Sequence, residues 1–254
     1  MRMKLENLLE TELDLTVFRY LTMPKFLSVF SLQALWFSKL NKLNDRYEGA
    51  YPDQILVDIK EYLRKATGQT NLPDSRIDGG REMNCVSCWF LGSEESEKMW
   101  VEYVGTSEGV VIQSTVRKLI QNVYTMFEDT YIGKVRYVDF DKKDVDRSYR
   151  HHKAFYKDAK MYSHESELRI VTPCFKHPRC VKSNGQLYTI EECSGKNMNA
   201  FELPGLNIRI EFSRLIEKII LAPGASRKLE QDLRGLFAIN NLMIPIERSK
   251  FQKL

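Results

Sequence analysis

The chain has 254 residues, of which 43% are hydrophobic and 11% aromatic, and this composition excludes an intrinsically disordered chain. The net charge of +4 is mildly basic without any polybasic run, which allows a groove for an anionic ligand or RNA but does not require one. No apolar run reaches the ~18 residues needed to cross a bilayer, and acidic residues interrupt the N-terminal leucines. We therefore expect no membrane span, no signal peptide and a cytoplasmic location.

The first half of the chain alternates short apolar strands with amphipathic helices. Its pattern predicts an N-terminal helix over residues 1–15, a strand over 16–21, and a helix that begins at Pro24 with Thr22 as its N-cap. Further strands are expected at 35–38, 82–90 and 109–114, and further helices at 51–65, 93–104 and 116–124. Residues 69–80 combine Gly, Pro, Asp and Asn, which predicts an exposed loop.

The second half continues with strands at 133–138, 168–172, 208–212, 218–222 and 242–246, and with a helix at 225–236. Pro245 allows the last of these strands only at the edge of a sheet. Residues 141–162 are rich in charge and predict one charged helix. Because strands and helices do not alternate in a regular βαβ order, we expect an α+β fold. It would be a single domain over 1–254, with a split or strongly bent mixed β-sheet and flanking helices.

The cysteines give no sign of a cross-linked or metal-bound protein. They are Cys85, Cys88, Cys174, Cys180 and Cys193, an odd number that favours reduced thiols. Cys85 and Cys88 lie three apart in a predicted strand and so face opposite sides, which disfavours joint chelation. Cys174, His177, Cys180 and Cys193 match no common zinc-ligand spacing. We therefore expect no structural disulfide and no bound metal.

Common catalytic signatures are absent from the sequence. It contains no Gly-rich phosphate loop, no His-Glu-x-x-His and no Gly-x-Ser-x-Gly, so the common kinase, dehydrogenase, zincin and hydrolase classes are excluded. Arg19, between Phe18 and Tyr20, is costly to bury unless it is paired or faces a cleft. Its guanidinium suits a phosphate or a carboxylate, and a structural salt bridge is the alternative.

Glu165 and Glu167 precede the predicted strand at 168–172. In an extended segment their carboxylates would share one face, and their repulsion would raise one pKa unless a cation intervened. Arg169 continues on that face and is the candidate partner. Paired carboxylates of this kind stabilise an oxocarbenium ion. The alternative is a solvated strand end.

Aromatic side chains gather around Ser87, which lies in an apolar strand. Trp89 shares its face, and Trp100 and Tyr103 are three apart on the helix that follows. Together they could form a stacking platform for a flat ring. Trp100 could equally belong to the hydrophobic core.

These segments together resemble a large bacterial family of domains of unknown function over residues 16–225. The matching motifs are Phe18-Arg19-Tyr20, Leu35-Trp36-Phe37-Ser38, Asn44-Asp45-x-x-Glu48, Ser87-Cys88-Trp89, Met99-Trp100-x-x-Tyr103, Gly109-Val110 and Glu165-x-Glu167-x-Arg169. The family usually has Pro where this chain has Arg46. Membership assigns no reaction.

The layout also resembles mono-ADP-ribosyltransferases of the Arg–Ser–Glu type. Arg19 on an early strand, Ser87 on a central strand and Glu165-Ser-Glu167 heading a late strand follow the order of that group, although its Ser-Thr-Ser is Ser87-Cys88-Trp89 here. The resemblance implies an ADP-ribosyltransferase-like fold with NAD as substrate. Arg19 would bind the NAD phosphates, Ser87 would brace the ribose, Glu167 would stabilise the oxocarbenium ion, and Glu165 would orient or deprotonate the acceptor.

The same resemblance implies that Tyr20 or Trp89 stacks on the nicotinamide, with Trp100 and Tyr103 nearby. The acceptor would be a protein or a nucleic acid, and the protein a bacterial toxin or phage-defence effector with an antitoxin or regulatory partner. Two alternatives stay open. One is a nucleic-acid-binding or nucleic-acid-processing protein with a basic groove through Arg147, Arg150 and Lys153. The other is a non-enzymatic partner-binding module.

Overall fold

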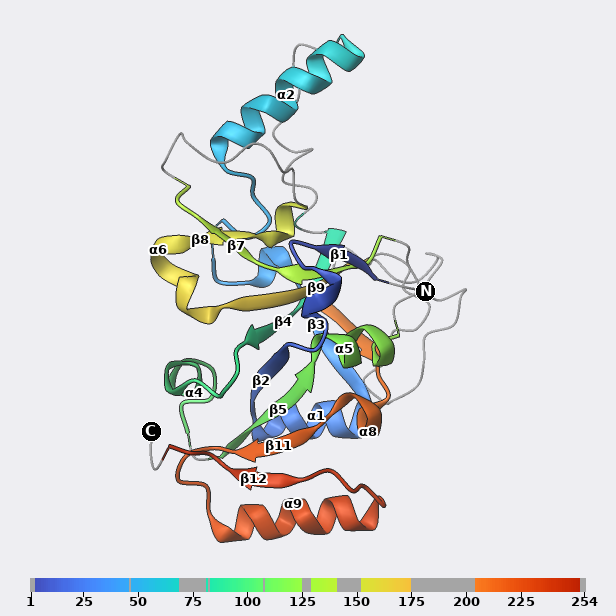
Figure 1. The fold of residues 1–254 in the computed structure, drawn as a ribbon, viewed down its shortest axis with the longest axis vertical. Helices are drawn as coiled ribbons and strands as arrows, with labels where there is room; N and C mark the ends of the chain where they lie inside the picture. The colour runs from blue at the N-terminus through green and yellow to red at the C-terminus, as the bar shows by residue number, and fades with distance from the viewer. Residues whose placement is uncertain are drawn as a thin grey trace.

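The computed structural model describes residues 3–45, 47–68, 81, 83–106, 108–124, 129–140, 152–174 and 204–251 (Figure 1). Its helices are α1 (Met23–Leu32), α2 (Asp53–Thr67), α4 (Glu97–Tyr103), α5 (Val116–Asn122), α6 (Ala159–Tyr162), α8 (Phe212–Leu215) and α9 (Arg227–Ile239). Its strands are β1 (Lys4–Glu6), β2 (Thr16–Thr22), β3 (Ala34–Lys39), β4 (Asn84–Leu91), β5 (Gly109–Thr115), β6 (Tyr131–Lys134), β7 (Arg136–Val138), β8 (Tyr156–Asp158), β9 (Glu167–Pro173), β10 (Gly205–Arg209), β11 (Lys218–Leu221) and β12 (Ile246–Arg248). The described residues form one open, mixed α+β domain.

Ten of these strands form one mixed sheet that forks at β4. The main path runs β1-β6-β9-β4-β2-β5-β11-β12, and β3 and β10 form a branch. Strand β9 pairs along one side of β4, from Asn84 to Phe90. On the other side β3 pairs with Cys85 and Val86, whereas β2 pairs with Phe90 and Leu91. Neither β2 nor β3 pairs with residues 87–89, so the two strands diverge beside this part of β4.

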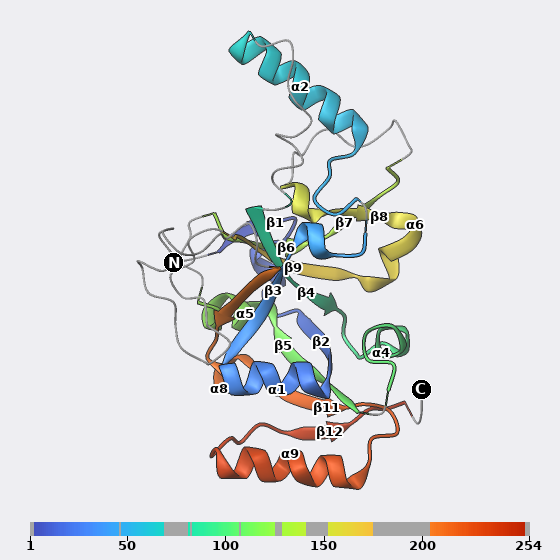
Figure 2. The ribbon, with the colours of Figure 1, turned by 180° about the vertical axis from the view of Figure 1, so that it is seen from behind.

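The two faces of the sheet carry separate hydrophobic clusters. On one face Phe26 of α1, Phe212 of α8 and Phe237 of α9 contact one another over the strands. On the other face α4 places Trp100 against Tyr20 of β2. Period-two alternation along β2 and β5 supplies apolar side chains to both faces, which fixes the register. In both ribbon views α2 extends away from the sheet (Figures 1 and 2).

Most of the predicted strands and helices are present, and the differences arise where tertiary pairing decides local structure. The helix expected over 1–15 was wrong, because Lys4–Glu6 adds as a parallel strand to β6 and a 3-10 turn follows at Glu10–Glu12. The single helix expected over 141–162 was also wrong: residues 152–162 contain a 3-10 turn at Lys153–Phe155, then β8 and α6, while 141–151 lie outside the described residues. Residues 69–80 also lie outside them. The final strand occupies the sheet edge, as expected, but it begins directly after Pro245, at Ile246–Arg248, instead of spanning 242–246.

A disulfide joins Cys85 of β4 to Cys174, which directly follows β9. The expectation that the chain has no structural disulfide was therefore wrong. Antiparallel pairing places Cys85 opposite Thr172, two residues before Cys174. A further backbone hydrogen bond, from the Cys174 amide to the Met83 carbonyl at 2.7 Å, keeps Cys174 next to β4. An odd cysteine number excludes only complete pairing, and Cys88 is a free thiol. Cys180, Cys193 and His177 lie outside the described residues.

Within the part of the chain that is described, no helix has the length and apolar character required to cross a bilayer.

Candidate functional site

Two polar clusters lie back to back across β4. Ser87 and Trp89 point to one face of the sheet, and Cys88 and Phe90 point to the other. Residues paired across antiparallel strands share a face, so Glu167, opposite Phe90, and Arg169, opposite Cys88, belong to the second face. Arg19 alternates with Phe18, which is opposite Phe90, and therefore belongs to the first face. The structure brings Arg19 and Ser87 together but places Glu167 on the opposite side of the sheet.

The first cluster, which we call the fork site, consists of Arg19, Trp36, Ser87 and Trp89. The Arg19 guanidinium spans the gap between β2 and β3: Nη1 donates to Ser87 Oγ, and Nη2 donates to the Trp36 carbonyl at 2.8 Å. It also lies 5.6 Å from the centre of the Trp89 ring, whose Nε1 donates to Ser87 Oγ at 3.1 Å. Two strands and the fork between them thus fix the orientation of this arginine.

Arg19 is a partly buried positive charge surrounded by neutral groups. Among the described residues no carboxylate forms an ion pair with it, and its recorded partners are a hydroxyl, a carbonyl and an indole ring. Burial lowers the pKa of Arg19 to about 10, which leaves it protonated at neutral pH. The structural salt bridge considered from the sequence is therefore absent from the described part of the chain. A half-buried guanidinium without an anionic partner is suited to binding an external anion.

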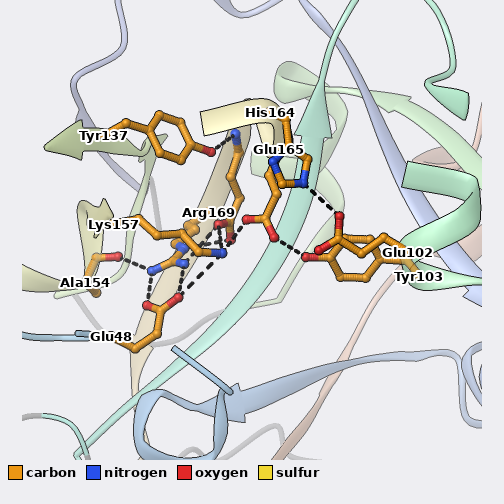
Figure 3. Close-up of polar contacts among 10 residues, drawn as sticks. Glu48, Glu102, Tyr103, Tyr137, Ala154, Lys157, His164, Glu165 and Arg169 are labelled. Carbon is orange, nitrogen blue, oxygen red and sulfur yellow. Dashed lines mark hydrogen bonds and ion pairs between the residues drawn. The ribbon is translucent and has the colours of Figure 1, made fainter. Parts of the chain in front are cut away.

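The second cluster, which we call the acid cluster, is a buried ionic network (Figure 3). Its members are Glu48, Lys157, Glu165, Glu167 and Arg169. Arg169 donates to both oxygens of Glu48 at 2.6 and 2.5 Å, and to both oxygens of Glu167 at 2.7 and 2.9 Å. Lys157 Nζ bonds Glu165 and lies 3.3 Å from Glu167 and 3.7 Å from Glu48. Two cations thereby hold three buried carboxylates in place.

The two carboxylates of the Glu-x-Glu pair lie close together, but not because both residues belong to one strand, as strand periodicity predicted. Glu165 ends a 3-10 turn at Ser163–Glu165, and Ser166 takes a left-handed conformation with φ 39°, so only Glu167 belongs to β9. Lys157 joins the two side chains. With exposures of 2% for Glu165 and 5% for Glu167, neither is the solvated strand end that was considered. The predicted pairing of Glu167 with Arg169 on one face is confirmed.

The electrostatics of the acid cluster favour ionised Glu167. Burial acts to raise the pKa of Glu167, but Arg169 and Lys157 outweigh it and bring the pKa to about 2. Burial and the neighbouring Glu167 raise the pKa of Glu48, although Arg169 opposes them. Glu167 is therefore an ionised carboxylate whose charge is balanced by Arg169 and Lys157 and whose two oxygens both accept hydrogen bonds. Without rearrangement it cannot stabilise a developing cation.

Tyr103 connects the acid cluster with the surface, and a His164–Glu102 pair lies beside it. Tyr103, which is 42% exposed, donates its hydroxyl hydrogen to Glu165. Next to it, His164 Nε2 lies 2.7 Å from a carboxylate oxygen of Glu102. Burial and the carboxylate of Glu165 raise the pKa of Tyr103, so its hydroxyl keeps the proton. Glu165 is thus the member of the acid cluster that bonds the partly exposed Tyr103 (Figure 3).

The remaining aromatic candidates are core residues in this structure. Trp100 and Trp89 are fully buried, and Tyr20 packs edge-on against Trp100 with ring centres 5.2 Å apart. The Tyr20 hydroxyl also accepts a hydrogen bond from the Ser96 amide at 2.6 Å. None of these three rings presents a free face for stacking. Trp36, which sequence reasoning did not propose, is 40% exposed at the fork site.

Sequence reasoning also missed Glu48 and Lys157. Glu48 stood in the quoted Asn44-Asp45-x-x-Glu48 motif, and its burial at 1% was the missing information. Lys157 stood in the segment 141–162 that was predicted as one charged helix. Of the residues expected to line a basic groove, Lys153 is buried, and Arg147 and Arg150 lie outside the described residues.

Comparison with known proteins leaves the site to be interpreted from its own chemistry. No protein-family model matches the sequence. No curated protein matches it either. The resemblances noted from the motifs therefore stay predictions.

Proposed function

We propose that the chain binds NAD through the phosphate groups at the fork site and uses it as the donor in ADP-ribosyl transfer to a protein or nucleic acid. The observation that carries this proposal is Arg19, a half-buried guanidinium that has only neutral partners among the described residues. A diphosphate would supply the anion that this arginine lacks, through two parallel charge-assisted hydrogen bonds.

The order of strands in the sheet also supports the proposal. The strands that carry Arg19, Ser87 and Glu167 are β2, β4 and β9, and they are consecutive neighbours in the sheet. Residues 87–89 have no strand partner on the side of the fork. Backbone amides next to the Arg19 guanidinium could therefore contribute to ligand binding.

The catalytic roles differ from those that the resemblance implies. Glu167 is paired with Arg169 on the opposite face, so in our proposal it holds Arg169 and Lys157 in position. Because the acid cluster lies on the other face of the sheet from Arg19, we assign none of its carboxylates to the transfer step. A role as a toxin or phage-defence effector stays a prediction.

The test is calorimetric NAD binding combined with nicotinamide release, first with wild type and then with Arg19→Gln. Loss of a charge-assisted contact to phosphate is worth ~2–3 kcal/mol, so the affinity of Arg19→Gln for NAD should fall ~30- to 150-fold. Arg117→Gln is the matched control, since Arg117 pairs with Asp14 on the surface, and it should bind NAD as wild type does. Wild type that neither binds NAD nor releases nicotinamide would end the proposal.

Glu165→Gln tests whether the acid cluster takes part in the reaction. Since Glu165 lies on the other face of the sheet from Arg19, this variant should bind NAD and release nicotinamide as wild type does. NAD binding without nicotinamide release, in wild type tested with a broad panel of acceptors, would reduce the function to nucleotide binding.

A further inference from the structure

Beyond the proposed transferase function, and independent of it, a cluster of metal-ligand atoms lies at the outer edge of the acid cluster. We propose that Glu102, His164 and Glu165 bind a divalent transition-metal ion, with Zn²⁺ as the expected occupant. One ligand atom from each of the three side chains lies within 4.8 Å of the other two. The expectation of no bound metal rested on the odd number of cysteines and on the Cys-x-x-Cys in a strand, and it did not include this set of side chains.

The geometry needs only small side-chain movements. His164 Nε2 and the nearest Glu102 oxygen are 2.7 Å apart. Ligand atoms ~2.1 Å from a tetrahedral ion stand ~3.4 Å from each other. The closest pair would therefore open by ~0.7 Å, which rotation of the 39% exposed Glu102 side chain can supply. The third ligand, Glu165, follows His164 directly in the 3-10 turn Ser163–Glu165.

Glu165 is already held as metal ligands usually are, by hydrogen bonds from residues outside the coordination sphere. Tyr103 donates to Oε1 and Lys157 donates to Oε2. A carboxylate oxygen has two lone pairs, so Oε1 can accept from Tyr103 and still bind an ion. Such outer contacts fix the orientation of the ligand before the ion arrives.

The charge of the surroundings also favours a cation. With Glu102 included, four carboxylates (Glu48, Glu102, Glu165 and Glu167) surround two fixed cations, Lys157 and Arg169. When all four carboxylates are ionised, these six side chains carry a formal charge of −2, which one divalent ion balances. A ligand set with one imidazole and two carboxylates suits Zn²⁺ and related transition ions, whereas Mg²⁺ and Ca²⁺ prefer oxygen alone.

The test is titration of EDTA-treated, dialysed full chain with ZnCl₂ in a calorimeter, with MgCl₂ as a second probe. We expect one Zn²⁺ per chain and no Mg²⁺ binding at the same concentrations. His164→Gln and Glu102→Gln should each weaken Zn²⁺ binding at least ~10-fold. Glu97→Gln, an exposed carboxylate in the first turn of the same helix, is the matched control and should bind Zn²⁺ as wild type does.

Titration with CoCl₂ separates this site from the cysteines of the chain, because thiolate ligation gives intense sulfur-to-cobalt charge-transfer absorption and imidazole–carboxylate ligation does not. Circular dichroism should show that both ligand variants remain folded, since His164 and Glu102 are partly exposed. The proposal is overturned if wild type binds no Zn²⁺ at ZnCl₂ concentrations 10- to 100-fold above ~10 μM. It is also overturned if the double variant His164→Gln/Glu102→Gln binds Zn²⁺ with unchanged affinity.

Discussion

The Glu167 carboxylate accepts hydrogen bonds from Arg169 Nε and Nη2 and lies 3.3 Å from Lys157 Nζ. Removing one charge from a buried ionic network leaves its partners uncompensated, which typically costs ~3–5 kcal/mol. We therefore expect Glu167→Gln to lower the free energy of unfolding by that amount in urea titrations at pH 7. The alternative of a solvated strand end, at which such a replacement would cost little, was wrong because Glu167 is buried.

Acid titration supplies a second measurement of the same residue. The pKa of Glu167 is about 2 in the folded chain, against an ordinary value of 4.5, so its stabilisation is present above pH 4.5 and is lost as the pH falls towards 2. Glu167→Gln should lack this part of the pH dependence. Glu247→Gln is the control, because Glu247 pairs with Lys218 on the surface, and its unfolding free energy should stay within ~0.5 kcal/mol of wild type. Equal stability of Glu167→Gln and wild type would contradict the network.

How far these side chains could be predicted depends on the distance along the chain between partners. Period-two alternation was sufficient to place Arg169 on the face of Glu167. Glu48 and Lys157 come from segments 121 and 12 residues away from Arg169, and only tertiary structure brings them there. Arg19 and Ser87 could be proposed as site residues from their own strands. Their position on the other face of the sheet from Glu167 depends on the pairing register of β2, β4 and β9, which the sequence does not show.

At the scale of elements, the β4–β9 pair is tied at one end by the Cys85–Cys174 disulfide, which closes a loop with a sequence separation of 89 residues. Cross-links of this kind typically add ~2–4 kcal/mol, mainly by restricting the unfolded chain. Cys174→Ser should lower the free energy of unfolding by that amount without reductant. In excess dithiothreitol wild type should lose the same stability, and the gap between the two proteins should close. A gap that persists under reduction would mean that packing of the sulfur, rather than the cross-link, stabilises the chain.

The elements that the sequence predicted correctly have strong local patterns, such as the β-branched run Val110–Ile112 of β5 and the Ser226 N-cap of α9, whose side chain accepts from the Leu229 amide. Residues 4–6 show no such pattern, and their strand exists because β6 offers a parallel edge. Pairing at that edge leaves no space at Gly133, where an added Cβ would lie 1.9 Å from the Glu6 carbonyl oxygen. The need for glycine at position 133 can be recognised only once the pairing of β1 with β6 is known.

At the scale of the whole molecule, the fork site and the acid cluster are two separate centres with β4 between them. Arg19 and Glu167 share no recorded bonding partner. Substitutions at independent positions add within ~0.3–0.5 kcal/mol. We therefore expect the double variant Arg19→Gln/Glu167→Gln to lose the sum of the two single losses in unfolding free energy. A coupling energy above ~1 kcal/mol would instead indicate one continuous Arg–Ser–Glu site.

The long span of the Glu48–Arg169 pair also sets an order of events in time. Its partners stand 121 residues apart, so the pair cannot form until most of the central sheet has assembled. Until then each charge is better solvated by water than by protein. Contacts that form after the transition state affect the rate of unfolding more than the rate of folding. The acid cluster should accordingly form late in folding, so that it lowers the rate of unfolding and has little effect on the rate of folding.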